Sequence, residues 1–200
     1  MNKLMGRVLS ALGLGSTGST DKGASNSPQK NAGVVQGLRM KALSLKAQDI
    51  GLNRQNFPKL VWGILFETAY DRGAFTLVVL GDGTASLYFS TGGGIIGAGP
   101  HQSVRKASEQ LLSAASHFVS SASPVTTYPM PVSGQSTFYF LSYDGVLSYS
   151  ANERELGEGR DKLSGLFHAA HGVVARMREI QQARRGDAAH GDEQSSKTPE

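Results

Sequence analysis

The sequence contains no cysteine in its 200 residues. This absence excludes a disulfide framework and cysteine-ligated zinc, and it fits a reducing compartment. Long hydrophobic runs are absent too, because no apolar stretch approaches the roughly 18–20 residues needed to span a bilayer. The chain starts with a short apolar stretch, but Arg7 interrupts it and no small-residue cleavage pattern follows, which argues against a signal peptide. We therefore expect a cytoplasmic protein.

The central part of the sequence also lacks a surplus of positive charge. Residues 1–46 contain seven Lys or Arg and one Asp, whereas residues 47–159 contain six basic and nine acidic residues. A nucleic-acid-binding domain normally gathers Lys and Arg on one folded surface. Because the high pI comes mainly from the N-terminal residues, we expect no nucleic-acid partner.

Recognisable catalytic and metal-binding patterns are missing. The chain has no G-x-S-x-G nucleophile elbow, no Gly-Lys-Ser/Thr end of a P-loop and no H-E-x-x-H pair. His168 and His171 are spaced i, i+3 on a predicted helix, but no third ligand accompanies them, so they are interpreted as a helix-edge pair. Glu67 lies at the end of a predicted strand and is a catalytic candidate if that end borders a cleft, but a carboxylate at a strand end more commonly faces solvent. We therefore expect neither an enzyme nor a metal or other cofactor.

Apolar periodicity divides the chain into three parts. Residues 1–37 contain an amphipathic segment and a flexible linker, residues 38–183 form a single α+β domain, and residues 184–200 form a disordered tail. Within the domain, helical patterns predict helices at 38–50, 100–121 and 161–183. Alternating or continuous apolar runs predict strands at 61–68, 74–80, 84–90, 137–143 and 146–150.

The order of these elements defines the expected fold. Gly81-Asp82-Gly83 and Asp144-Gly145 are hairpin turns, so the strands on either side of each turn are antiparallel. The prediction is an α+β domain: a five-stranded, mainly antiparallel sheet with two long helices and a short preceding helix, covered on one or both faces. The apolar run from Val61 to Thr68 predicts a strand buried on both sides, with Trp62 inside.

This element order resembles the roadblock, longin and profilin-like group of small regulatory folds. The resemblance covers the sequence of helices and strands over about residues 38–183. The segments VWGILFE, TASLYFSTGGGIIGAG, SYDGV and LFHAAHGVV are also similar to small bacterial proteins with no assigned role. The first resemblance implies a regulatory fold and the second a bacterial origin. Neither implies a particular chemistry.

A glycine-rich loop precedes the middle helix. Its residues 92–97 match G-x-G-x-x-G, and glycines there let a backbone approach phosphate near a helix N-terminus. The preceding hairpin strand and the lack of an acidic residue ~20 positions later argue against a dinucleotide site. Two interpretations stay open: a structural turn with Ile95 and Ile96 buried beneath it, or an anion or nucleotide site. The candidate ligand residues in the second case are Gly92, Gly93, Gly94, Gly97, Gly99 and His101.

The N-terminal segment is a candidate docking element. Its apolar stripe consists of Leu4, Met5, Val8 and Leu12. A short basic amphipathic helix on a flexible linker docks in a partner's groove or, weakly, on an anionic membrane surface.

Two classes of function follow. The leading one is a non-enzymatic protein-interaction or regulatory module, which acts on an unknown protein partner or through self-association. Weak membrane-surface contact through residues 1–12 belongs to this class. The alternative is a small-molecule or anion/nucleotide sensor that uses the glycine-rich loop.

Overall fold

The computed structural model describes residues 28–195. The α-helices in this range are α2 (Pro28–Ser44), α3 (Gln102–Phe118), α4 (Glu153–Gly157) and α5 (Ser164–Ser195). The strands are β1 (Val61–Tyr70), β2 (Gly73–Leu80), β3 (Ala85–Phe89), β4 (Gly94–Ile95), β5 (Ser123–Pro124), β6 (Gln135–Ser142) and β7 (Gly145–Asn152). Two 3-10 helices, η1 (Ala47–Ile50) and η2 (Val119–Ser121), follow α2 and α3. The predicted α+β class is confirmed.

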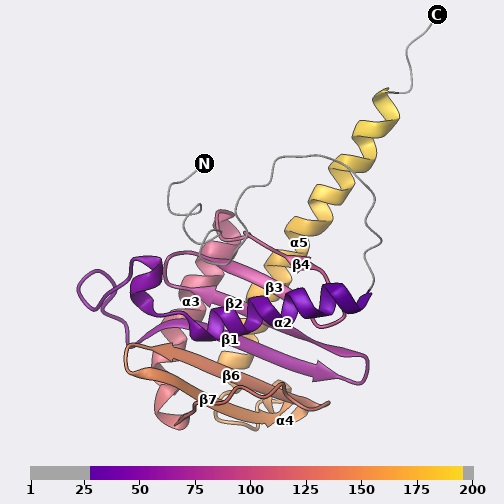
Figure 1. The fold of residues 1–200 in the computed structure, drawn as a ribbon. Coiled ribbons are helices and arrows are strands. Elements are labelled where there is room, and N and C mark those ends of the chain that lie inside the picture. Colours follow the sequence, from indigo (N-terminus) through magenta and orange to yellow (C-terminus); the bar gives the residue numbers. More distant parts are fainter. Residues whose placement is uncertain (1–27, 196–200) are drawn as a thin grey trace, which may run out of the picture.

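The strands form one sheet in the order β4-β3-β2-β1-β6-β7-β5, with every neighbouring pair antiparallel (Figure 1). The five predicted strands are present as β1, β2, β3, β6 and β7. The predicted number of strands is wrong, because β4 and β5 extend the two edges and bring the total in the described range to seven. Each has two residues, which is too short to show the alternation that identifies a strand in sequence.

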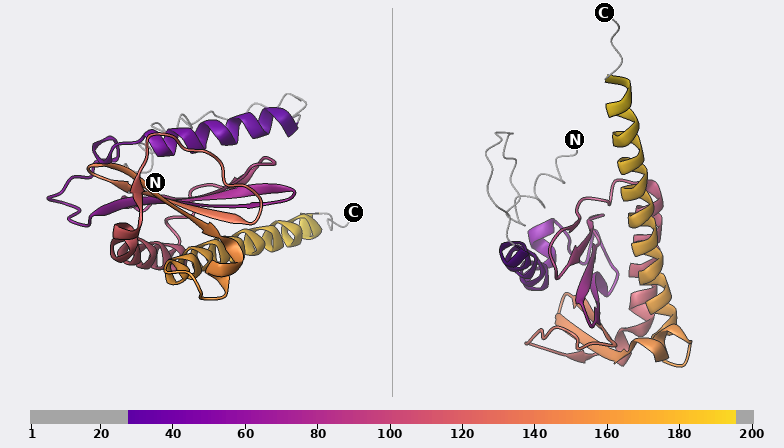
Figure 2. Two further views of the ribbon diagram at one scale, coloured as in Figure 1. Left: turned by 90° about the horizontal axis from the view of Figure 1, so that it is seen from below. Right: turned by 90° about the vertical axis from the view of Figure 1, so that its right-hand side faces the viewer.

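Helices cover both faces of the sheet. Figure 2 shows α2 on one side and α3 with α5 on the other. The larger apolar core lies between the sheet and α3 with α5, and a second core lies between the sheet and α2. The central strand β1 is buried along its length except at Tyr70, which confirms the strand predicted to be covered on both sides.

A bulge in β1 assigns its side chains to the two cores. The register of β1 against β6 shifts between Val61 and Gly63. As a result Val61 and Ile64 both belong to the larger core, whereas Trp62 belongs to the α2 core. Trp62 is 2% exposed, which confirms the prediction that it is buried.

The first described helix starts earlier than predicted. The sequence predicts a helix over 38–50 after a linker, but α2 runs from Pro28 to Ser44 and η1 follows it. Gly51 ends η1 in the left-handed region, with φ of 78°, where the sequence places the stop. Among the side chains of α2 that the structure describes, which begin at Gly33, Val35 is the first that packs against the core. The sequence before it has no apolar stripe of the kind that identifies a helix. The preceding helix is therefore not short, since α2 and α3 each have 17 residues.

The last helix is longer than predicted. It continues to Ser195, whereas a disordered tail is predicted from residue 184. Its C-terminal part projects beyond the sheet (Figure 1). Apolar periodicity is lost where a helix leaves the core, but Ala, Arg and Gln still favour helix there. None of the described helices is long and apolar enough to cross a membrane.

Candidate functional site

A fully buried ion pair joins α2 to the central strand. Arg39 of α2 is 1% exposed and Glu67 of β1 is 0% exposed. Arg39 Nε donates to Glu67 Oε1 at 2.6 Å, and Arg39 Nη2 donates to Glu67 Oε2 at 2.7 Å. Thr76 of β2 donates its hydroxyl to Glu67 Oε1 at 2.8 Å. The carboxylate therefore accepts three hydrogen bonds inside the protein.

The other donors of Arg39 bind the loop that precedes β6. Nη1 donates to the carbonyl oxygen of Tyr128 at 2.9 Å, and Nη2 donates to that of Pro129 at 3.2 Å. Tyr139 of β6 donates its hydroxyl to the same Pro129 carbonyl at 2.7 Å. Each guanidinium nitrogen thus has an oxygen acceptor, and these bonds offset the cost of removing the charge from water.

The pKa values of Arg39 and Tyr139 in this network are both raised. Burial lowers the pKa of Arg39, but the hydrogen bond and charge of Glu67 more than compensate, so the pKa lies above its ordinary value. Burial, and then the Glu67 carboxylate, raise the pKa of Tyr139. The guanidinium therefore stays charged, and the phenol keeps the proton that it donates to Pro129.

The structure corrects the interpretation of Glu67. The sequence places it at a strand end facing solvent, but β1 continues to Tyr70 and α2 covers this position. A general base needs a lone pair that a substrate proton can reach. The oxygens of Glu67 are bonded to Arg39 and Thr76 and closed off from water, so this carboxylate holds α2 in place.

A cavity of about 360 Å³ adjoins the ion pair. It lies between the N-terminal half of α2, the ends of β2 and β3, and the loop before β6. Its lining residues are Gly33, Val35, Gln36, Arg39, Thr76, Ser90 and Met130. The volume is within the ~300–1,000 Å³ of ligand pockets. The first half of α2 therefore does not pack tightly on the sheet.

The glycine-rich loop has a structural explanation at each of its glycines. Gly92, Gly93 and Gly97 have positive φ, which favours glycine. A Cβ on Gly94 would overlap the carbonyl oxygen of Leu87 in β3, and one on Gly99 would overlap that of Gly83. The loop therefore folds back on β3 through β4 before α3 begins.

The flanking residues of this loop point in different directions. Ile95 is buried as expected, but Ile96 is 42% exposed, which corrects the expectation that both are covered. His101 lies at the N-cap of α3, and its Nε2 is 2.7 Å from Nη2 of Arg184 in α5. The candidate ligand residues thus lie along one loop, but the imidazole is directed at α5.

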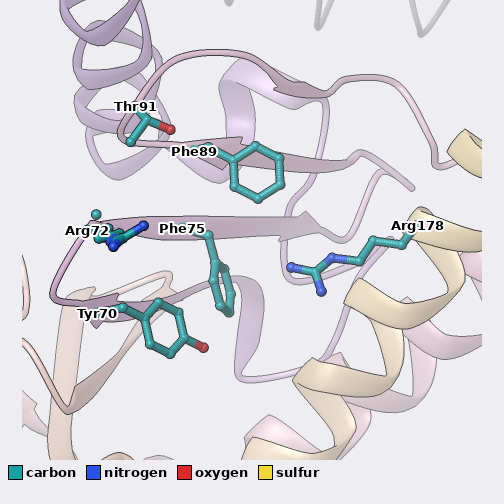
Figure 3. A pocket seen from close by; sticks show the side chains of 8 residues that line it. Tyr70, Arg72, Phe75, Phe89, Thr91 and Arg178 are labelled. Carbon is teal, nitrogen blue, oxygen red and sulfur yellow. The ribbon is translucent and has the colours of Figure 1, made fainter.

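A second pocket, of about 250 Å³, lies on the α5 side of the sheet (Figure 3). Phe75 of β2 and Phe89 of β3 are paired directly in the sheet register and contribute its apolar wall. Figure 3 shows Arg178 extending from α5 toward the rings of Phe75 and Tyr70, with Arg72 at the opposite end. The remaining lining residues are Gly73, Ala74 and Thr91. Thr91 directly precedes Gly92, so the predicted loop reaches this pocket only through its flank.

The two histidines of α5 occupy different surroundings. His168 is exposed, whereas His171 packs against the rings of Phe66, Phe75 and Phe167. No group of three His, Asp or Glu side chains suited to a metal ion occurs in the described part of the chain. The structure thus places this pair at the edge of the core.

The candidate docking residues of the N-terminal segment lie outside the described residues. These are Leu4, Met5, Val8 and Leu12.

The Arg39–Glu67 network is not predicted from the sequence, although a signal for it is present. Arg39 lies among Leu38, Ala42 and Leu43 on the apolar side of a helix, and Glu67 ends an otherwise apolar run. A basic and an acidic residue, each inside an apolar pattern, indicate a buried pair. The pocket of Figure 3 leaves no such signal, because its residues come from three separate segments.

No family model matches the chain, and the comparisons found no similar curated protein or solved structure.

Proposed function

We propose that the chain is a non-enzymatic interaction or regulatory module in which α2 is the regulated element. The observation that carries this proposal is the Arg39–Glu67 ion pair, which fixes α2 over the central strand. The experiment that tests it removes this pair and follows both the docking of α2 and the association of the protein.

The energetics of a buried ion pair suit a switch. Replacing such a pair by apolar residues of similar volume is often neutral or stabilising, so the pair adds little net stability. Removing one partner, however, leaves an uncompensated buried charge and costs roughly 3–5 kcal/mol. Separation of Arg39 from Glu67 therefore changes the docking of α2 sharply.

The sequence of α2 suits a helix that detaches. Among residues 33–44, full burial is limited to Leu38, Arg39, Ala42 and Leu43. Gly33 and Gly37 each weaken the helix by roughly 1 kcal/mol relative to Ala. With so little apolar burial, one unpaired charge beneath α2 is enough to displace the helix.

The surface beneath α2 suits a protein partner. It consists of large apolar and aromatic side chains from four neighbouring strands, and these are Trp62, Leu65, Val78, Tyr88 and Tyr139. Detachment of α2 would expose these side chains together, and contiguous apolar surface of this kind promotes association. A partner protein or a second copy of the chain would then cover the same face.

Two variants separate the docked and detached states. Arg39→Met leaves the Glu67 carboxylate without its counter-ion, whereas Arg39→Met combined with Glu67→Leu removes both charges. We expect the single variant to show faster amide exchange in residues 28–44 than wild type, red-shifted emission from Trp62 and increased association. The double variant keeps α2 docked and associates no more than wild type.

Light scattering measures self-association. Quantitative affinity purification with wild type, the single variant and the double variant measures binding of partners. The matched control is Arg54→Gln, which removes the exposed ion pair between Arg54 and Asp144. The proposal fails if Arg39→Met speeds exchange in α3 as much as in α2, because the ion pair then supports the whole domain. It also fails if the single and double variants associate equally.

A further inference from the structure

We propose that the pocket between the β1–β2 turn, the end of β3 and α5 binds a small organic anion with an aromatic ring. The ligand class is an aromatic carboxylate or a related single-ring anion. This site lies on the α5 face of the sheet and does not depend on the role proposed for α2 (Figures 2 and 3).

The charge of the pocket selects an anion. Arg72 and Arg178 line it, and no acidic side chain does. Neither guanidinium forms an ion pair with a carboxylate among the side chains that the structure describes. A guanidinium group presents N–H donors in a planar fork that matches a carboxylate or phosphate. The donors at this pocket are therefore available to a ligand.

The walls of the pocket select an aromatic ring. Phe75 and Phe89 face each other across β2 and β3, and the ring of Tyr70 lies 6.3 Å from that of Phe75. Tyr70, the last residue of β1, is 47% exposed, so part of its ring surface is open to a ligand. A ligand ring that packs against these side chains removes apolar surface from water on both partners.

Tyr70 adds a neutral phenol to the pocket. Burial, and then the charge and hydrogen bonding of the Glu153 carboxylate, raise its pKa to about 12, against a smaller opposing effect of Arg178. The phenol is therefore protonated at neutral pH and brings no negative charge to the pocket. Because the carboxylate of Glu153 interacts with this hydroxyl, the anionic group of a ligand is expected at Arg178 or Arg72, and Tyr70 contributes its ring.

The size of the pocket limits the ligand. Its volume of about 250 Å³ is below the ~300–1,000 Å³ typical of pockets for drug-sized ligands. A single ring with one anionic group fits this space better than a nucleotide. The inferred class therefore differs from the nucleotide that the glycine-rich loop suggests in sequence.

Protein-observed NMR titration tests this inference on the full chain. The probe is benzoate, and the comparison compounds are benzyl alcohol, which lacks the charge, and inorganic phosphate, which lacks the ring. We expect saturable shifts with benzoate and about tenfold or weaker binding of the other two, since each loses one class of contact. Intermolecular NOEs should connect benzoate to ring protons of Phe75, Phe89 and Tyr70.

Substitutions at the arginines locate the site. Arg178→Gln and Arg72→Gln should each weaken benzoate binding by about tenfold, the usual effect of losing one charge-assisted hydrogen bond. Arg176→Gln is the matched control, because Arg176 is exposed on the same helix but pairs with Glu179 outside the pocket. Its affinity for benzoate should equal that of wild type.

Three results would overturn the inference. One is the absence of saturable benzoate binding to the wild-type chain. Another is equal binding of benzoate and benzyl alcohol, or of benzoate and inorganic phosphate. The third is a set of NOEs from benzoate to residues outside the pocket. This measurement uses the wild-type protein, so it is valid even if an arginine variant fails to fold.

Discussion

Arg39 and Glu67 are 28 positions apart in the sequence, and they form a bidentate ion pair from which water is excluded. The pair connects a helix with limited apolar burial to the most buried strand of the sheet. Because Arg39 also binds the carbonyl groups of Tyr128 and Pro129, it fixes three segments in one arrangement. We therefore expect loss of this guanidinium group alone, with the Glu67 carboxylate retained, to disturb the α2 layer.

Removing one charge of this pair should destabilise the protein far more than removing both. Glu67→Gln leaves the Arg39 guanidinium buried without its counter-ion, and we expect the free energy of unfolding to fall by roughly 3–5 kcal/mol. Arg39→Met combined with Glu67→Leu should change it by less than about 1.5 kcal/mol, because apolar side chains of similar volume replace both charges. Urea denaturation followed by Trp62 emission measures both values.

The carboxylate of Glu158, which forms exposed ion pairs with Arg154 and Arg160, is the control for this measurement. Surface ion pairs contribute about 0–1 kcal/mol, so Glu158→Gln should have little effect. Equal losses for Glu67→Gln and for the double substitution would show that volume, and not unpaired charge, determines the result.

The glycines of the loop before α3 make a second prediction about stability. A methyl group on Gly94 meets the carbonyl oxygen of Leu87, a backbone atom that cannot rotate away. We expect Gly94→Ala to lower the free energy of unfolding by roughly 1–3 kcal/mol, the usual cost of overpacking. Thermal denaturation with and without phosphate or a nucleotide measures the change and reveals any dependence on a ligand.

Gly172 in α5 is the matched control. Nothing lies within 4 Å of a Cβ built at this helical position, so Gly172→Ala should stabilise the protein by roughly 0.5–1 kcal/mol. A neutral Gly94→Ala substitution would contradict the close contact with Leu87. Loss of a ligand-induced stabilisation in Gly94→Ala would instead favour the anion site suggested by the sequence.

The sequence predicts the strands of this protein better than its helix ends. Period-2 patterns and hairpin turns depend on neighbouring residues, so β1, β2, β3, β6 and β7 are recovered within two residues at each end. The ends of α2 and α5 are not recovered, because the turns near Pro28 and Ser195 lie where a helix extends past the core and shows no apolar stripe. Apolar periodicity indicates which residues pack against the core, so it does not mark the parts of a helix that lie beyond the core.

The candidate sites are harder to predict than the fold. Arg39 and Glu67 are joined by tertiary structure alone, and Tyr70, Phe89 and Arg178 come from segments whose proximity depends on strand order and helix packing. The glycine-rich loop is conspicuous in sequence for the opposite reason. Its residues are contiguous, although Gly94 is explained by its contact with β3.

His171 should make the protein sensitive to mild acid. Its ring lies 4.4 Å from that of Phe167 and 5.3 Å from that of Phe66, and its buried Nε2 has no hydrogen-bond partner among the described residues. Burial lowers the pKa of His171, and the charges of His168 and Arg178 lower it further. The folded protein therefore takes up this proton at a lower pH than the unfolded chain.

The sign of the effect follows from this difference. Above the unfolded-state pKa of about 6.5, His171 is neutral in both the folded and the unfolded protein. At these pH values its protonation does not lower the free energy of unfolding. As the pH falls below that value the unfolded chain binds the proton first, so the free energy of unfolding decreases until the folded pKa is passed.

We expect His171→Leu to remove this part of the pH dependence, as measured by urea denaturation at about pH 7.5 and about pH 5. His168→Gln should retain most of it, because burial, the largest cause of the lowered His171 pKa, is unchanged when this exposed side chain is replaced. If wild type and His171→Leu lose the same stability between the two pH values, the proton uptake that destabilises the protein occurs at another group.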